Sequence, residues 1–545
     1  MTELSSYLGQ WVATRGSELL AAGASAVRVY RAALAIDPSE NFFLHFIEDE
    51  TSESLPLAPL VETTRPFLER EGLPAYLVGG AVRDAFLERE SHDLDFVVPR
   101  DALRLTFRLG DIAGAPAYIL DKERETGRIV LTDDGVTVDV ATYRDADLLA
   151  DLYDRDFTIN AMALPATART RDSLIDPLGG LSDLLARRIR LTHAEALLDD
   201  PVRALRAIRL AAELAFELTR DTEEAVLAAS VFLPATVSAE RVRDELVKIV
   251  DGPRTAAAVM QMHTLGLLAP VLPELEALAP VPQSPPHYEP VLAHTISVLR
   301  WLEYLLAGLF ETPVPPDDLL DQMRAALFPY LAPLAEYLNR PVVGGLDGKT
   351  ILGLAALFHD AGKRQTITQE EDGRYRFFGH AEAGALLAAA RLRDLCFSNE
   401  AIDQVSRIVA EHMRPLLLAD AQGGELSRRA AYRYFKAGGA SGLDVALLAL
   451  ADHLATYNGP GNEQVWSNLL ALVTSLLEFY FNQYEETVKP PALVNGRDLM
   501  DYLDLPPGPE IGRLLQLIEE NQAAGQIKSV EEALRFARQA HEVGA

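Results

Sequence analysis

The chain has 545 residues, too many for one hydrophobic core, so at about 100 to 200 residues per domain we expect three or more domains. It carries 80 acidic and 50 basic residues. The formal charge of -30 argues against a broad, sequence-independent grip on nucleic acid, although a local basic patch is compatible with it. The single cysteine, Cys396, excludes an internal disulfide framework and suits a reducing compartment.

Signals for secretion or membrane insertion are not evident in the sequence. The stretch MTELSSYLGQWVATRGSELL lacks the basic start and apolar run of a signal peptide. No run of about 18 uninterrupted apolar residues occurs either. We therefore expect a cytoplasmic protein without a membrane partner.

The pattern of apolar residues changes along the chain. Residues 1–60 predict a helix or two, to which we assign no chemistry. From Ala75 to about Arg144, short runs rich in Val, Ile and Tyr alternate with polar turns, which predicts strands mixed with a few helices. From about Asp199 onward, Ala- and Leu-rich patterns predict a long all-α body. The expected fold class is α+β, with a mixed-sheet head followed by helices.

Two proline-rich segments interrupt the helical part. EALAPVPQSPPHYEP, residues 276–290, is the strongest predicted domain boundary, because proline breaks a helix. ETPVPPDD, residues 311–318, predicts a further loop.

A pair of glycines lies at a predicted strand-to-helix turn. We expect a strand at Tyr76–Val78 and a helix that starts at Ala81, with Gly79 and Gly80 between them. Glycines at such a turn let backbone N–H groups approach a ligand, and the helix N-terminus favours an anion such as phosphate. Arg83, in the first helical turn, could reach the same anion with a bidentate fork.

The next predicted strand carries two carboxylates on one face. Its period of two places Asp93 and Asp95 opposite Leu94 and Phe96. Two such carboxylates repel each other unless a cation lies between them, and Mg²⁺ prefers oxygen ligands of this kind. Asp139, in a later strand, is a third candidate, and three carboxylates could hold two metals. Taken singly, these residues are more often turn residues in contact with solvent.

Several motifs together resemble the bacterial family of CCA-adding tRNA nucleotidyltransferases and poly(A) polymerases, which belongs to the polymerase-β-like superfamily. The resemblance runs from about residue 75 to 276 without a large gap. It rests on GGAVRD (79–84) with DLD (93–95), RDFTINAMA (155–163), DPLGGLSDLLARRIR (176–190), DDPVRALRAIRLAA (199–212), SAERVRDELVKIV (238–250) and GLLAPVLPELE (266–276).

The resemblance implies roles for the residues of the first two motifs. Asp93 and Asp95 would bind Mg²⁺, with Asp139 as the third catalytic carboxylate. The triphosphate and ribose of the nucleotide would be bound by residues that match these motifs, namely Gly79, Gly80, Arg83, Asp84, Arg155, Asp156 and Asn160. One departure lies beside them, because Asp154 stands where the family usually has arginine, so a contact to RNA or triphosphate is expected to be weaker.

The motif DDPVRALRAIRLAA (199–212) also predicts a helix on its own evidence. Asp199 and Asp200 precede Pro201, a favourable helix start, although the family usually has glutamate at the first of these positions. The apolar residues that follow share one side of the helix, and the polar ones lie opposite. Taken alone, the arginines are more often a solvated face. By the resemblance, nucleotide selection and contact fall to Asp200, Arg203, Arg206 and Arg209, of which the first two would discriminate CTP and ATP.

A second group of candidate ligands lies beyond the proline-rich segment. Its order of histidines and aspartates resembles the HD phosphohydrolase domain. Imidazoles and carboxylates suit a transition metal, and a metal-bound water can attack a phosphoester. A single histidine here is more often structural. The candidate ligands are His294, His359, Asp360, His380, His412 and Asp452.

The expected segments follow from these matches. They are an N-terminal helical extension (1–60), a nucleotidyltransferase head (61–195), a helical nucleotide- and RNA-binding region (196–280), an HD-like metal-binding domain (290–460) and a C-terminal helical RNA-binding region (461–545).

The predicted function is template-independent addition of CMP and AMP to the 3′ end of tRNA, with CTP, ATP and Mg²⁺. A poly(A) polymerase, or an enzyme that adds only A or only CC, shares the same motifs. Two alternatives come from other classes: an HD phosphohydrolase with an accessory head, and an RNA-binding protein that has lost catalysis. The pair of Asp93 and Asp95 argues against the last one. The oligomeric state does not follow from the sequence.

Overall fold

The computed structural model describes residues 4–7, 10–15, 18–24, 26–38, 43–47, 61, 65–69, 74–131, 135–168, 171–310, 317–422 and 426–544. The chain divides into two compact units, Met1–Thr236 and Val237–Ala545, and each is described by itself. The predicted loop at 311–318 lies largely outside the described residues.

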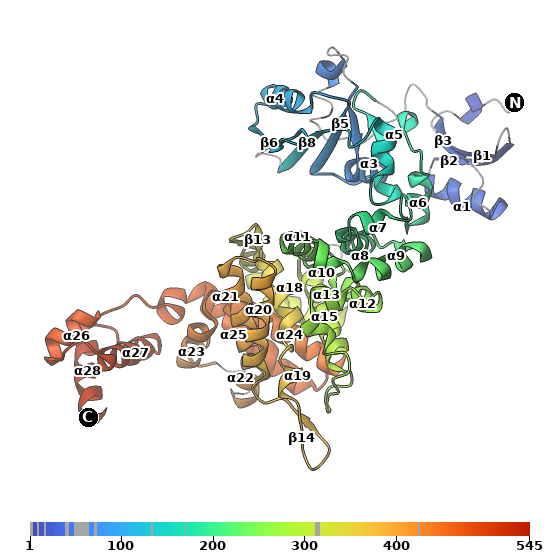
Figure 1. Ribbon diagram of the computed structural model, residues 1–545. Coiled ribbons are helices and arrows are strands. Elements are labelled where there is room, and N and C mark those ends of the chain that lie inside the picture. Colours follow the sequence, from blue (N-terminus) through green and yellow to red (C-terminus); the bar gives the residue numbers. More distant parts are fainter. Residues whose placement is uncertain are drawn as a thin grey trace. The chain divides into compact units, whose positions relative to one another are not determined.

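A six-stranded mixed sheet forms the centre of the first unit (Figure 1). Its strands are ordered β6-β7-β8-β5-β4-β9, and only β5 and β8 pair in parallel. The bounds are β4 (Tyr76–Val78), β5 (Asp93–Val98), β6 (Ala117–Asp121), β7 (Thr126–Leu131), β8 (Val136–Thr142) and β9 (Ala163–Pro165).

Helices join and cover this sheet. The side chains of Val78, Val97 and Leu152 pack in one buried cluster, which holds α5 against the sheet. The helical bounds of the unit are α1 (Ala26–Ile36), α3 (Gly80–Phe86), α4 (Ala102–Ala113), α5 (Leu148–Tyr153), α6 (Gly180–Ala186), α7 (Ala196–Asp199), α8 (Val202–Leu214), α9 (Arg220–Ser230) and α10 (Leu233–Thr236), with short 3-10 turns that include η2 (Thr158–Asn160). Two-residue strands β10 (Arg188–Ile189) and β11 (Glu217–Leu218) pair in parallel.

The prediction of a helical N-terminal extension is wrong for most of its described residues. Strands β1 (Gln10–Arg15), β2 (Glu18–Gly23) and β3 (Phe43–Ile47) form an antiparallel sheet of order β2-β1-β3, and α1 is the α-helix between them. Leucine and alanine in β2 favour a helix by propensity, but pairing with β1, whose Trp11, Val12 and Ala13 are buried, overrides that preference.

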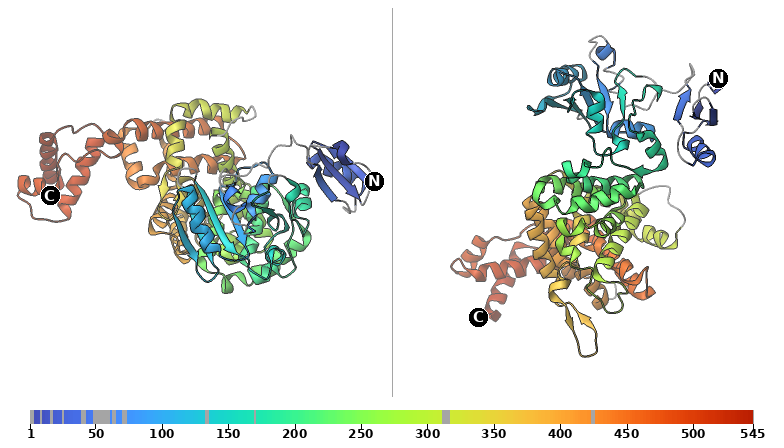
Figure 2. Two further views of the ribbon diagram at one scale, coloured as in Figure 1. Left: turned by 90° about the horizontal axis from the view of Figure 1, so that it is seen from above. Right: turned by 45° about the vertical axis from the view of Figure 1, so that its right-hand side comes forward.

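The second unit is almost entirely helical (Figure 2). Its described helices are α11 (Ala239–Asp251), α12 (Thr255–Thr264), α13 (Leu268–Val271), α14 (Pro273–Glu276), α15 (Val291–Phe310), α16 (Asp318–Leu327), α17 (Leu331–Leu338), α18 (Gly348–Phe358), α19 (Lys363–Thr366), α20 (His380–Asp394), α21 (Asn399–Glu411), α22 (Arg414–Gln422), α23 (Arg428–Gly438), α24 (Gly442–Tyr457), α25 (Glu463–Asn482), α26 (Gly496–Leu503), α27 (Pro509–Ala523) and α28 (Val530–Gly544). Two short hairpins interrupt them, β12–β13 (Pro341–Val342 with Leu346–Asp347) and β14–β15 (Thr368–Gln369 with Tyr375–Arg376).

The boundary between the units lies earlier than the proline-rich segment. Helix α11 packs on α18 and α12 packs on α15, so both belong to the second unit. Of this segment, Glu276 ends α14 and residues 277–290 form a loop within that unit, where Leu278 and Val281 anchor it in the core. The expected α+β class is confirmed. Among the helices that the structure describes, none has the length and apolar content needed to cross a membrane.

Gly180, at the first position of α6, is required by close packing. A Cβ atom there would lie 2.1 Å from the Thr158 carbonyl oxygen. We expect Gly180→Ala to lower the free energy of unfolding of the first unit by about 1 to 3 kcal/mol, because α6 must move away from η2. Thermal unfolding followed by circular dichroism measures this. Gly512→Ala, on an open face of α27, is the control and should leave stability unchanged or slightly increased. Equal effects of the two substitutions would contradict the packing argument.

Candidate functional site

The turn between β4 and α3 brings three sequence segments together, GGAVRD, DLD and RDFTINAMA. Gly79 has φ +74°, and a Cβ atom there would lie 3.2 Å from both Asp95 Oδ2 and Arg155 Nη1. Glycine therefore fits both the backbone conformation and the narrow space. Gly80 follows as the first residue of α3, so the glycines lie at the strand-to-helix turn as predicted, and the helix starts one residue earlier than expected.

Strand β5 presents its two aspartates as predicted. Asp93 and Asp95 are exposed, while Leu94 and Phe96 are buried on the other face. The pKa of Asp95 is raised, because the surrounding protein removes part of its hydration; Arg155 opposes this effect, and neighbouring carboxylates add to it. Thr137 on β8 donates a hydrogen bond to Asp93 Oδ1. The face is therefore rich in negative charge that a cation would relieve.

Asp139 lies beside Asp95 but has a different partner. The two residues are direct neighbours in the parallel pairing of β5 and β8. On the other side, Arg128 of β7 donates from Nε to Asp139 Oδ1 and from Nη2 to Oδ2, both at 2.7 Å. Asp93, Asp95 and Asp139 are not among the groups of described residues whose possible ligand atoms converge within 4.8 Å. The structure thus places the three predicted carboxylates on adjacent strands without joining them at ligand distance.

Arg83 is the start of a polar chain that crosses the site. Its Nε and Nη2 donate to the two carboxylate oxygens of Asp84 at 2.8 and 3.0 Å, and its Nη1 donates to Asn160 Oδ1 at 2.9 Å. Asn160 Nδ2 donates to Asp156 Oδ1 at 3.1 Å, and Arg206 Nη1 donates to Asp156 Oδ2 at 3.0 Å. Four of the predicted triphosphate and ribose residues, Arg83, Asp84, Asn160 and Asp156, therefore form one network with Arg206 on α8.

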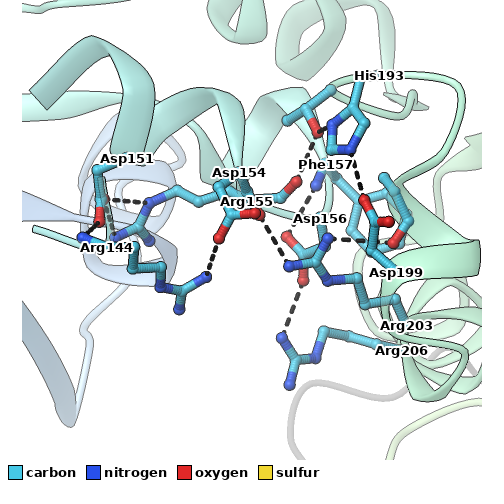
Figure 3. Close-up of polar contacts among 12 residues, drawn as sticks. Arg144, Asp151, Asp154, Arg155, Asp156, Phe157, His193, Asp199, Arg203 and Arg206 are labelled. Carbon is cyan, nitrogen blue, oxygen red and sulfur yellow. Dashed lines mark hydrogen bonds and ion pairs between the residues drawn. The ribbon is translucent and has the colours of Figure 1, made fainter. Parts of the chain in front are cut away.

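The second motif is anchored by a buried carboxylate that was not predicted. Asp151 is fully buried and accepts from Arg155 Nη2 at 3.1 Å and from the Arg144 backbone N–H at 3.0 Å (Figure 3). Asp154, the departure from the family pattern, lies 3.5 Å from Arg144 Nη1 in an exposed ion pair. The aspartate thus has a counterion of its own, and its backbone carbonyl accepts from Arg203 Nη2 at 2.8 Å.

The arginines of α8 are not a solvated face, so the more common interpretation is wrong here. Arg203 is 7% exposed and also donates to the Ala196 carbonyl oxygen at 3.1 Å. Arg206 and Arg209 are half-buried, and Arg209 donates to Glu213 at 3.0 Å. Helix α8 begins at Val202 directly after Pro201, as its start signal predicts, and Asp200 lies just before it.

A second cluster lies in the core of the second unit, where the HD-like ligands were predicted. His294 Nε2 lies 3.0 Å from Asp452 Oδ1 and 3.8 Å from Asp360 Oδ2. His359 Nε2 lies 3.3 Å from Asp360 Oδ2, and His380 Nε2 lies 3.6 Å from Asp360 Oδ1. All six predicted residues are brought together, since His380 Nε2 also lies 3.2 Å from His412 Nε2.

The imidazoles of this cluster are oriented by the backbone. The Nδ1–H groups of His359, His380 and His412 each donate to the carbonyl oxygen three residues earlier, at 2.7 to 2.8 Å. Their Nε2 atoms therefore point into the cluster, and His359 Nε2 is buried without a hydrogen-bond partner among the described atoms. Such orientation of the distal nitrogen by a second hydrogen bond is typical of metal-binding histidine.

Charge in the cluster is dense. Lys363 Nζ lies 2.7 Å from Asp360 Oδ2, a contact not predicted from sequence. The pKa of Asp360 is lowered well below its ordinary value: burial opposes ionisation, but Lys363 and the neighbouring His359 outweigh it. Burial and His359 lower the pKa of His412 to about 4. His287 stacks on His294 with ring centroids 4.7 Å apart, and burial likewise lowers its pKa to about 4.

The side chains missed by sequence reasoning share one property, because each is a partner of a predicted residue rather than a motif residue. The spacing of Asp151 and Arg155, four apart, is a recognisable helical ion-pair signal. Arg128 has no comparable local signal, since its contact depends on the strand register between β7 and β8.

Comparisons with known proteins agree with this geometry. Family models match residues 75–190 (Poly A polymerase head domain), 215–278 ("Probable RNA and SrmB- binding site of polymerase A") and 377–537 (tRNA nucleotidyltransferase domain 2). An A-adding tRNA nucleotidyltransferase of Deinococcus radiodurans is 32% identical over 484 residues, covering 86% of this chain and 97% of the relative. A CC-adding tRNA nucleotidyltransferase of Thermus thermophilus is 33% identical over 474 residues, covering 85% and 92%.

Solved structures agree at the level of the fold. The structure of a CCA-adding enzyme complexed with ATP covers 88% of this chain and 95% of that chain, with a TM-score of 0.54 at 19% identity. An apo form of a CCA-adding enzyme gives a TM-score of 0.53 at 20% identity, covering 88% and 93%.

The buried carboxylate of Asp156 should make stability depend on pH. Burial opposes its ionisation, but Arg206, Asn160 and the Phe157 N–H outweigh this and lower its pKa. The stabilisation is therefore complete above the unfolded pKa of about 4 and is lost as pH falls through the folded value. Asp156→Asn should lower the free energy of unfolding by about 1 to 3 kcal/mol at pH 7. Its stability should also fall less steeply below pH ~4 than that of the wild type.

Acid titration of unfolding by urea, followed by circular dichroism, measures both effects. The matched control is Asp154→Asn, the same chemical change at an exposed carboxylate, which should alter stability by less than about 0.5 kcal/mol. If the free energy of unfolding fell equally with decreasing pH in the wild type and in Asp156→Asn, Asp156 would not be the group whose ionisation makes stability depend on pH.

Proposed function

Because the chain belongs to the family of tRNA nucleotidyltransferases, we propose that it transfers nucleotides from CTP and ATP to the 3′ end of a tRNA. The observation that carries this proposal is the meeting of three motif segments at one turn, where Gly79 lies against Asp95 and Arg155. A tRNA substrate is consistent with the cytoplasmic location expected from the sequence.

The exposed carboxylates of β5 have the chemistry of a magnesium site. Asp93 and Asp95 offer oxygen ligands on one face, and the pKa of Asp95 is raised chiefly by burial, with a smaller contribution from the neighbouring carboxylates Asp139 and Asp93. Mg²⁺ held by these two residues would supply positive charge against the triphosphate and favour deprotonation of the attacking 3′-hydroxyl. Residues that hold the reactants in place contribute mainly by positioning and electrostatics.

The polar chain through Asp156 would orient the nucleotide. Arg83 uses three of its N–H groups on Asp84 and Asn160, which fixes its guanidinium and leaves the others to donate to a triphosphate. Gly79, Gly80 and Arg155 would lie along the same anion. On the sugar side, Asn160 and Asp156 are fixed relative to each other, so they could discriminate ribose from deoxyribose.

Selection of the base would fall to α8 and the residue before it. Arg203 is held rigidly by two backbone carbonyls, and Arg206 is held by Asp156. Rigid donors give a fixed hydrogen-bonding pattern for a base edge, with Asp200 as the acceptor and Arg209 nearby. Relatives that add CC and relatives that add A both match this chain, so addition of CCA, of CC alone or of A alone is decided by assay.

The assay uses purified protein, CTP, ATP and Mg²⁺ with tRNAs that end before CCA, after the first C, or after CC. We expect extension of at least one of these acceptors by one to three nucleotides. Asp93→Asn and Asp95→Asn should each lower the rate at least about 100-fold, because each removes a metal ligand while keeping side-chain size. Sequencing gels identify the nucleotides added.

Asp101→Asn, at an exposed position after β5, is the matched control and should leave the rate within about twofold. A long A tail would assign the chain to poly(A) polymerases. Failure to extend any acceptor by a folded protein would overturn the proposed function.

The second unit supports a further proposal, that its histidine and aspartate cluster binds a divalent transition metal. His294, His359 and Asp360 form one group with ligand atoms within 4.8 Å, and Asp360, His380 and His412 form another. Asp360 belongs to both, so its carboxylate could bridge two ions, and imidazole with carboxylate suits a first-row metal. An HD-type phosphohydrolase activity would use this site.

Residues 461–545 would contact the RNA body.

The metal proposal is tested by elemental analysis of the purified protein. We expect a divalent transition metal to co-purify, and His359→Gln or His412→Gln to weaken its retention at least about tenfold, because each removes an imidazole directed into the cluster. His263→Gln is the matched control, since His263 lies outside the cluster and pairs with Glu276 at 2.9 Å. Equal metal content in all variants would show that the cluster is not the binding site.

A further inference from the structure

Arg128 occupies a position beside the proposed magnesium site that no motif predicts. It lies on β7, directly opposite Asp139 in the antiparallel pairing of β7 and β8. Asp139 in turn lies opposite Asp95 in the parallel pairing of β8 and β5. The three side chains therefore form a row of one cation and two anions across adjacent strands.

Arg128 donates hydrogen bonds to both carboxylate oxygens of Asp139. Nε and Nη2 reach one oxygen each at 2.7 Å, which is the planar, bidentate geometry that arginine alone provides. The hydrogen bond to Asp139 outweighs the effect of burial and raises the pKa of Arg128, so the guanidinium stays charged. Both side chains are only about a third or less exposed, at 33% and 23%, so water screens the pair incompletely.

This pairing conflicts with a role for Asp139 as a free metal ligand. A carboxylate whose two oxygens both accept strong hydrogen bonds from a cation is a poor donor to a second cation. Asp93 and Asp95 carry no arginine partner of this kind in the described contacts. The sheet therefore presents two accessible carboxylates and one that is neutralised by its neighbour.

Without Arg128, three carboxylates would stand on neighbouring positions of β5 and β8. Asp139 and Asp93 already raise the pKa of Asp95, after the larger effect of burial. The guanidinium limits this repulsion and keeps the row stable when no metal is bound. It also makes metal binding to Asp139 less favourable, because a metal can bind this carboxylate only by displacing Arg128.

We propose that Arg128 is a positioning residue that withholds Asp139 from the metal and so sets the metal affinity of the nucleotidyl-transfer site. This inference rests on the proposed function of Asp93 and Asp95 as metal ligands. Arg128 acts through Asp139 and does not itself bind the metal. A purely structural Arg128 would affect folding and leave metal affinity unchanged.

The test is Mn²⁺ binding to the head site, measured by electron paramagnetic resonance without nucleotide or RNA. His359→Gln serves as the background in every sample, so that the cluster of the second unit contributes less to the signal. Arg128→Gln should tighten Mn²⁺ binding about tenfold, because Asp139 becomes available. Arg128→Lys should tighten it in the same direction, although the net charge is unchanged, because lysine lacks the bidentate fork.

Asp139→Asn distinguishes two causes of tighter Mn²⁺ binding: the release of Asp139 as a ligand, and the loss of the positive charge of Arg128. With Arg128 present, it should leave Mn²⁺ affinity within about twofold, and with Arg128→Gln it should cancel the gain. Arg124→Gln, at an arginine that is 85% exposed near the start of β7, removes the same charge and should leave affinity unchanged. Circular dichroism confirms that each variant is folded.

The outcomes distinguish two failures. Three results would overturn the role of Arg128. The first is a gain in Mn²⁺ affinity that persists when Asp139 is replaced, and the second is equal Mn²⁺ affinity of the wild type and both Arg128 variants. The third is a loss of Mn²⁺ affinity in Asp139→Asn alone that is as large as the loss in Asp95→Asn. Mn²⁺ binding that Asp93→Asn and Asp95→Asn leave intact would instead overturn the metal site of the proposed function.

Discussion

The carboxylate of Asp156 is 6% exposed, and its charge is tolerated because Arg206, Asn160 and the Phe157 N–H all donate to it. One partner is the next residue in the chain, and the other two lie on α8 and in η2. Arg206 lies on α8, while Asn160 extends the network to Arg83 on α3. An uncompensated buried charge is costly, so these elements are held in one arrangement by the need to satisfy a single group.

The same constraint explains why the proposed nucleotide site is ordered on one side and exposed on the other. Arg83, Asn160, Asp156 and Arg206 satisfy one another and need no ligand to hold their positions. The aspartates of β5 lie on the exposed face of the strand, and Arg155 offsets part of the rise in the pKa of Asp95 that burial and the neighbouring carboxylates cause. A preorganised polar side and a charged open side together favour binding of a nucleotide with its cation.

Local sequence patterns predicted those parts of the site whose geometry is local. The alternation at Asp93 to Phe96 places carboxylates and core residues on opposite faces, and Pro201 marks the start of α8. The N-terminal sheet was missed because β2 is rich in leucine and alanine, and only pairing with β1 makes it a strand. Arg128 was missed for the same reason. Its contact with Asp139 depends on which residues of two strands face each other, and register is a tertiary property.

The two proposed metal sites use a common electrostatic device in different surroundings. In the first unit, Arg128 neutralises Asp139 at the side of an exposed pair of aspartates. In the second unit, Lys363 lies against Asp360 inside a buried cluster of histidines. Burial makes the second arrangement far more costly to leave unpaired, which is why its imidazoles are fixed by backbone carbonyls and its carboxylate has a cation at hand. Lysine, a point charge on a flexible stem, can move aside more readily than a bidentate arginine. A metal at the proposed buried site would displace Lys363, which also donates to Gln283 at 2.7 Å, whereas a metal that gained Asp139 in the first unit would displace the bidentate Arg128.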